Sequence, residues 1–190
     1  MKKQQARLIT KHNWPWIIAI VLAVLLVGLV VHHHLQTSAQ NKIFQDTQSW
    51  LGSVMDDAAK KVPGGERVSE AYCSRNSVKY GQGDRFCTTE EDILYLVSED
   101  QFHAYVNKIQ PAISNSLDVN LKNLGPDSLS QVIGGYAFRH GVLSCYITYY
   151  GLKNESSFSY LSKIRNFENG LRVSLSCSGP AMAEYFPNRD

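Results

Sequence analysis

Acidic residues are absent from the first 45 positions of this 190-residue chain, and Asp46 is the first carboxylate. The same stretch carries four early cations, at Lys2, Lys3, Arg7 and Lys11. From residue 40 onward the other 15 Lys and Arg face all 17 Asp and Glu, so the bulk of the chain is slightly negative. Domains that bind nucleic acid usually carry a basic surface. The charge distribution therefore predicts no nucleic-acid partner.

The chain also lacks the short motifs that mark metal and catalytic sites. Its four cysteines form no Cys-x-x-Cys, and no histidine lies near a cysteine at zinc-ligand spacing. Beyond the run His32-His33-His34, which we interpret as solvating a helix end, only His103 and His140 remain. Neither stands in a Gly-x-Ser-x-Gly or His-Glu-x-x-His setting. We therefore expect no enzymatic activity, no cofactor and no metal, with a membrane-tethered enzyme as an alternative.

One uncharged apolar run, Trp14 to Val31, is 18 residues long and predicts a membrane-spanning helix. As a helix it would extend about 27 Å, close to the thickness of the hydrocarbon core of a bilayer. The cations before the run place the N-terminus in the cytoplasm and residues 35–190 outside. The run is longer than the apolar part of a signal peptide, so we expect an uncleaved, single-pass signal anchor in the cell membrane. Cleavage near Thr37-Ser38-Ala39 is the alternative.

The four cysteines all lie in the part of the chain predicted to be extracytoplasmic, where disulfides form. Cys73 and Cys87 bracket a polar loop with two glycines, and we predict that they pair. Cys145 and Cys177 lie in two alternating runs that are typical of strands, each on the more apolar face. They predict a second disulfide.

The remaining pattern predicts helices on one antiparallel sheet, an α+β fold. An apolar stripe over residues 38–62 predicts an amphipathic helix that ends at Pro63 and packs on the sheet of the same chain. We divide the chain into a basic tail (1–13), the anchor (14–31), a juxtamembrane segment with this helix (32–66) and an extracytoplasmic domain (67–190). In that domain we expect strands over 67–73, 93–97, 141–150 and 171–177, a helix from 102 to Pro111, and a short helix ending at Val132.

Two acidic runs were considered as ligand sites, Asp56-Asp57 and Glu90-Glu91-Asp92. A calcium loop needs alternating oxygen ligands around a glycine, and both runs lack this arrangement. We interpret the first run as a solvated helix face and the second as a loop.

Tyrosine is frequent, with ten residues in the chain. Exposed aromatic side chains anchor protein or glycan partners, but tyrosine also fills and borders the core of sheets. The sequence leaves both interpretations open. The candidate binding patch consists of Tyr146, Tyr149, Tyr150, Tyr160, Tyr185 and Phe186.

These features favour a non-enzymatic, membrane-anchored extracytoplasmic domain that binds a protein partner in an envelope or surface assembly. In outline, an apolar N-terminal helix, an amphipathic extension, an antiparallel sheet and a C-terminal disulfide resemble the layout of type IV pilins. The resemblance implies a filament subunit whose membrane helix packs against its own copies, and this is the alternative. Two features of type IV pilins are missing between Met1 and Val31: a short leader that ends in Gly, and an acidic residue early in the apolar helix.

Overall fold

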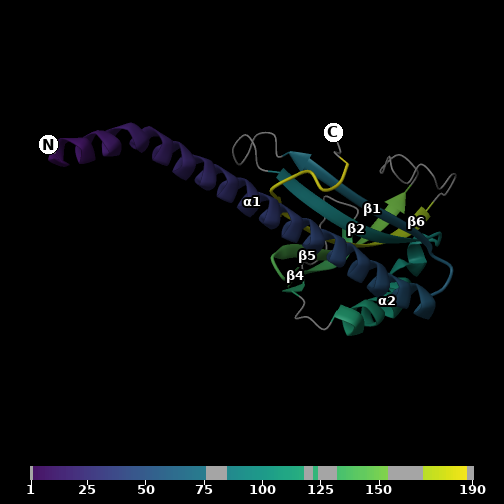
Figure 1. Cartoon of the computed structure of the whole chain (residues 1–190). Helices are drawn as coiled ribbons and strands as arrows, with labels where there is room; N and C mark the ends of the chain where they lie inside the picture. Colours follow the sequence, from purple (N-terminus) through teal and green to yellow (C-terminus); the bar gives the residue numbers. More distant parts are fainter. Residues whose placement is uncertain (1, 76–84, 118–121, 124–131, 154–168, 188–190) are drawn as a thin grey trace. The chain divides into compact units, whose positions relative to one another are not determined.

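The computed structural model describes residues 2–75, 85–117, 122–123, 132–153 and 169–187, with the backbone alone for residues 2–13, 75, 122–123, 132 and 153. The chain divides into two compact units, Met1–Asn41 and Lys42–Asp190. One long helix, α1 (Lys2–Lys61), supplies the first unit and continues into the second (Figure 1). This helix is long and apolar enough at its N-terminal end to span a membrane, and the side chains of residues 14–31 are all exposed.

The second unit is built on one antiparallel sheet with the strand order β1-β2-β6-β5-β4-β3. The C-terminal strand, β6, lies in the middle of this sheet because it pairs with β2 on one side and with β5 on the other. Together with two helices the sheet forms an α+β fold, as the sequence predicts. The elements are β1 (Glu66–Arg75), β2 (Arg85–Tyr95), a short 3₁₀ helix (Glu99–Gln101), α2 (Phe102–Leu117), β3 (Lys122–Asn123), β4 (Val132–His140), β5 (Leu143–Lys153) and β6 (Asn169–Ala181).

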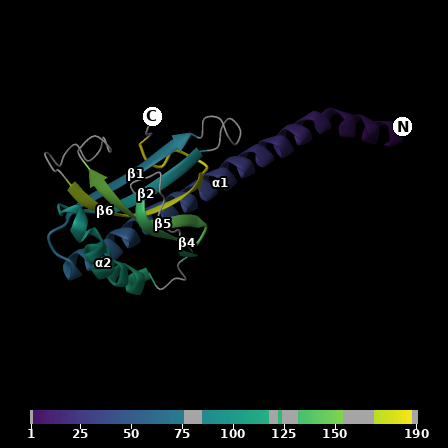
Figure 2. The same cartoon turned by 180° about the vertical axis from the view of Figure 1, so that it is seen from behind.

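Both helices of this unit pack on the same face of the sheet, which we call the helix-covered face (Figure 2). Phe44, Leu51 and Met55 of α1 are fully buried there. The predicted helix stripe therefore packs on the domain's own sheet, although Phe44 takes the place that the pattern gave to Ile43, which is 39% exposed. Alternate residues of the strands complete the core, and both predicted strand faces are buried: Leu143, Cys145, Ile147 and Tyr149 on β5, and Leu171, Val173, Leu175 and Cys177 on β6.

Two disulfides join neighbouring strands on the helix-covered face, and both predicted pairings are confirmed. Cys73–Cys87 links β1 to β2, and Cys145–Cys177 links β5 to β6. In each case the two cysteines lie directly opposite one another in the sheet. All four side chains are buried, so the bridges are part of the core.

Several predicted boundaries were wrong. Strand β2 begins at Arg85 and not at residue 93, so the acidic run before Ile93 is part of a strand. Helix α2 continues past Pro111 to Leu117, because buried Ile113 and Leu117 extend its apolar face beyond the proline. Val132, predicted to end a helix, begins β4, while residues 124–131 lie outside the described part of the chain.

Candidate functional site

A network of charged and polar groups joins α1 to the first two strands. Arg67 of β1 binds two carboxylates, those of Asp56 on α1 and Glu91 on β2, the latter with an N–O distance of 2.6 Å. The Ser69 hydroxyl donates a hydrogen bond to the other carboxylate oxygen of Glu91. Glu91 is only 4% exposed, so its charge is held by Arg67 and Ser69 and not by water.

A shallow depression of about 610 Å³ opens beside this network. The α1 side of the depression carries amides, hydroxyls and one carboxylate, and its sheet side ends at Arg67 and Glu91. Gly52 contributes no side chain to the α1 side of the depression. A Cβ at this position would lie 3.9 Å from Arg67 and 4.0 Å from Glu91. Every side chain of the lining is polar, so the depression suits a polar occupant: Gln45, Gln48, Ser49, Ser53, Asp56, Arg67 and Glu91.

A second ionic cluster lies on the opposite face of the sheet. Arg172 of β6 donates from Nε to Asp92, at 2.9 Å, and from Nη2 to Glu90, at 2.8 Å. The Ser174 hydroxyl donates to the same Glu90 oxygen, and the Tyr150 ring lies 5.2 Å from the guanidinium carbon. Asp92, Arg172 and Ser174 are each 3% exposed or less. Such a cluster fixes the register of β2 against β6, since Asp92, Arg172 and Ser174 are buried and hydrogen-bonded.

Two carboxylates compete for this one guanidinium. Burial, and after it repulsion from Glu90, raises the pKa of Asp92 to about 7, against the opposing effect of Arg172. Burial alone would lower the pKa of Arg172, but Asp92 and Glu90 outweigh it and raise that pKa. The cluster therefore holds a proton near neutral pH that an exposed aspartate would have lost.

The sequence indicated a loop for the acidic run Glu90-Glu91-Asp92, but the run lies in strand β2. Its three side chains alternate across β2, with Glu91 toward α1 and the other two on the opposite face. The other acidic run agrees with its interpretation, because Asp56 and Asp57 are exposed on α1. The signal that sequence reasoning missed was the alternation of Arg172 and Ser174 with apolar residues in β6, which marks a polar face opposite the core.

The structure describes five of the six aromatic residues of the candidate patch and does not bring these five together on one exposed surface. Tyr149 is 1% exposed on the helix-covered face, whereas its neighbours Tyr146 and Tyr150 lie on the opposite face. Tyr185 and Phe186 pack around Phe44. Tyr160 lies outside the described residues. Only Tyr146, at 41% exposed, remains an exposed aromatic among the five that are described.

The histidines take separate positions. His140 stacks on Trp50 of α1 with ring centroids 4.0 Å apart, and His103 is exposed on α2. Residues 32–34 are exposed on α1. Within the described ranges, no three His, Cys, Asp or Glu side chains are grouped so as to hold a metal ion.

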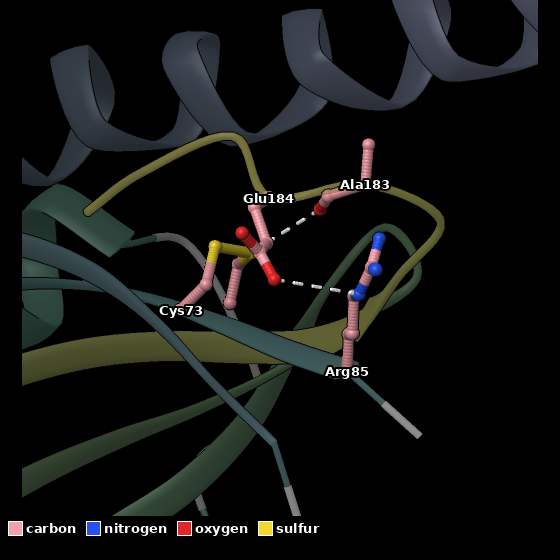
Figure 3. Close-up of a disulfide and its surroundings, with 5 residues drawn as sticks. Cys73, Arg85, Ala183 and Glu184 are labelled. Atoms are coloured by element: carbon pink, nitrogen blue, oxygen red, sulfur yellow. Dashed lines mark hydrogen bonds and ion pairs between the residues drawn. A yellow bond between two sulfur atoms is a disulfide. The ribbon is translucent and has the colours of Figure 1, made fainter. Parts of the chain in front are cut away.

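The C-terminal segment after β6 folds back over the first disulfide (Figure 3). The backbone N–H of Cys73 donates to the carbonyl of Pro187 at 2.9 Å, and Glu184 forms an ion pair with Arg85 at 3.7 Å. The Ala183 carbonyl oxygen lies 3.9 Å from the Cys87 sulfur, a packing contact because a disulfide sulfur has no proton to donate. The segment therefore meets the open edge of β1 at Cys73.

Comparisons with known proteins give no relative for this chain. No protein-family model, no curated protein and no solved structure matches it.

Proposed function

We propose that this chain is a single-pass membrane protein whose C-terminal domain lies outside the cytoplasm and binds a protein partner in an envelope or surface assembly, without catalysing a reaction. The observation that carries the proposal is the exposed apolar segment of residues 14–31, which precedes a disulfide-bearing domain in the same chain. An exposed stretch of this length is stable in a bilayer and not in water.

The orientation is supported by two independent features. The cations of the first 11 residues favour a cytoplasmic N-terminus, because positive charge is retained on that side. Disulfides form and persist outside the cytoplasm, which favours the same orientation for the domain. The non-enzymatic part of the proposal is supported by the use of the charged groups, since Arg67 and Arg172 hold neighbouring elements together.

Protease protection combined with thiol labelling tests the orientation. On intact cells or spheroplasts, we expect an added protease to digest the domain and a membrane-impermeant maleimide to label no cysteine until a reductant and a denaturant are added. A domain that is protected from protease, and whose four cysteines are labelled after lysis without reductant, would contradict the proposal.

A pilin-like filament subunit is a second candidate, favoured by the continuity of α1 from Lys2 to Lys61 and by the packing of its C-terminal part on an antiparallel sheet. This candidate predicts contacts between copies of the apolar helix. A cysteine substituted at Val24 or Val27 would then give disulfide-linked dimers in native membranes, and cysteines at both positions a ladder of crosslinked multimers, whereas an anchor that only tethers the domain would give monomers.

A further inference from the structure

Strand β1 is the outer strand of the sheet, and among the described strands it pairs with β2 alone (Figures 1 and 2). Strand β3 occupies the opposite edge of the sheet. A strand of ten residues at an edge presents a row of backbone donors and acceptors that a further strand is able to pair with.

The disulfide identifies which backbone groups of β1 point away from β2. The Cα atoms of Cys73 and Cys87 are 4.0 Å apart, which is typical of a non-hydrogen-bonded pair in an antiparallel ladder. The N–H and C=O groups of Cys73 therefore point outward, and so do those at every second residue before it. These residues are Arg67, Ser69 and Ala71, since the register with β2 runs without interruption from Glu66 to Arg75.

One of these outward groups already binds the backbone of another segment. The Cys73 N–H donates to the carbonyl of Pro187, where the C-terminal segment reaches the edge. Among the described residues, the outward groups of Arg67, Ser69 and Ala71 form no backbone hydrogen bond outside the sheet. In the described part of the chain, the edge thus accepts backbone at one end, while Arg67, Ser69 and Ala71 have outward groups that a further segment is able to pair with.

The surroundings of these three residues are acidic. On the helix-covered side the depression beside α1 contains Asp56 and Glu91, and on the other side of β1 lie Glu66 and Glu70. Arg67 binds two of these carboxylates, those of Asp56 and Glu91. With exposed Glu66, three carboxylates face one guanidinium, and this excess of negative charge favours a segment that carries positive charge.

We propose that β1, from Arg67 to Ala71, pairs with an extended, basic segment of a partner protein. Backbone hydrogen bonds from the outward groups would give the affinity, and alternate Lys or Arg side chains would enter the polar depression next to Asp56. This inference rests on the proposed role in protein–protein interaction and names the surface and the chemical nature of the partner segment.

Binding of a defined peptide to the full chain in detergent tests the inference. The probe is an octapeptide that alternates Lys with Val and Thr, compared with a counterpart in which Glu replaces Lys. We expect the Lys peptide to bind at low salt, and hydrogen exchange to slow at the amides of Arg67, Ser69 and Ala71. The amides of Val68 and Glu70, which point toward β2, are protected before and after binding.

A matched pair of variants separates the backbone from the side chain. Ser69→Pro removes the outward N–H and leaves the ladder with β2 intact, because that N–H does not point toward β2. Both Ser69→Pro and Ser69→Ala lose the hydroxyl that binds Glu91. We expect Ser69→Pro to weaken peptide binding by about tenfold, as lost edge hydrogen bonds imply, and Ser69→Ala to bind within about twofold of the wild type. Thermal unfolding of both variants checks that they fold.

Four outcomes would overturn the inference: no binding of the Lys peptide, equal binding of the Glu peptide, equal weakening by the two Ser69 variants, or self-association of the chain through β1. The assay uses purified protein, so its result does not depend on membrane orientation. Failure here would leave the protease-protection result standing, and failure of that test would leave the peptide result standing.

Discussion

The charge state of Asp92 affects the stability of the folded domain near neutral pH. When it is protonated, Glu90 and Arg172 form a neutral pair, and when it ionises the buried cluster carries an uncompensated negative charge. The folded chain therefore holds this proton up to pH about 7, whereas an aspartate in the unfolded chain releases it near pH 3.8. Because the folded state binds the proton more tightly, the free energy of unfolding decreases as the pH rises through this interval.

Asp92→Asn should remove most of this pH dependence. For the wild type, denaturant unfolding in detergent should show a loss of stability between pH 4 and pH 7 of at most about 4 kcal/mol, from 1.36 kcal/mol for each unit of pKa shift. The variant should give a nearly flat profile over the same range, because asparagine does not titrate. It also retains an acceptor for Arg172. Asp57→Asn, on the exposed face of α1, is the control and should keep the wild-type slope. An unchanged slope in Asp92→Asn would assign the titration to another group.

Sequence reasoning failed at the residues that depend on distant partners. Three consecutive acids are typical of a solvated loop, and nothing local shows that Arg67 lies beside Glu91 or that Arg172 lies beside Asp92. These pairs are 24 and 80 positions apart, so they exist only once the strands have aligned. The pairing of Cys145 with Cys177 was easier to predict, because both cysteines lie on the more apolar face of a strand and cysteines outside the cytoplasm form disulfides.

At the level of elements, the packing of β4 against β5 leaves no room for a side chain at Gly135. A Cβ added at Gly135 would lie 2.5 Å from the carbonyl oxygen of Ile147, whereas one at Gly134 would meet no atom within 4 Å. Gly135→Ala should therefore destabilise the domain by about 1–3 kcal/mol through a forced backbone shift. Gly134→Ala should change stability by less than about 1 kcal/mol. Urea unfolding gives the free energy of unfolding of both variants. Equal values would mean that β4 and β5 move apart to admit the Cβ at residue 135 without loss of stability.

The disulfides make a second prediction at this scale. On the loop-entropy model, loss of Cys73–Cys87 costs about 3 kcal/mol and loss of Cys145–Cys177 about 4 kcal/mol, because the second closes the longer loop. Paired Cys→Ala variants measured by denaturant unfolding should show this order. Ser178→Ala, next to Cys177, is the control. The reverse order would indicate that packing around the bridges outweighs loop closure.

Elements with a regular apolar pattern could be predicted from the sequence, whereas strand β4 and the end of helix α2, where the pattern is broken, could not. The C-terminal part of α1 and strands β5 and β6 show clear periodicity and were placed close to their observed positions. Strand β4 contains Gly134 and Gly135, which usually mark turns, and α2 contains Pro111, which usually ends a helix. Packing against the sheet outweighs these local preferences, and packing is not visible in a local pattern.

For the molecule as a whole, the proposed orientation depends on a few charges at one end. Replacing Lys2, Lys3, Arg7 and Lys11 by Glu, and adding four lysines just after Val31, reverses the charge difference across the apolar segment. We expect a large share of such molecules to insert with the domain in the cytoplasm, since retained positive charge sets orientation. Maleimide labelling of the cysteines after lysis would then increase from the wild-type level. A variant with an unchanged labelling pattern would show that orientation is set by the domain and not by the tail.

The positions of the two disulfides also determine how far the domain stretches under mechanical tension. Each bridge shortens the path that a pulling force follows, because the chain between bonded cysteines, with separations of 14 and 32 positions, is bypassed. No disulfide joins β2 to β6, so these two strands are held together by the hydrogen bonds of their ladder and by the Arg172 cluster. When β2 and β6 separate, the residues between bonded cysteines add nothing to the extended length. Without the bridges, each of these residues would add about 3.4 Å. When its strands separate, the domain therefore lengthens by a limited amount.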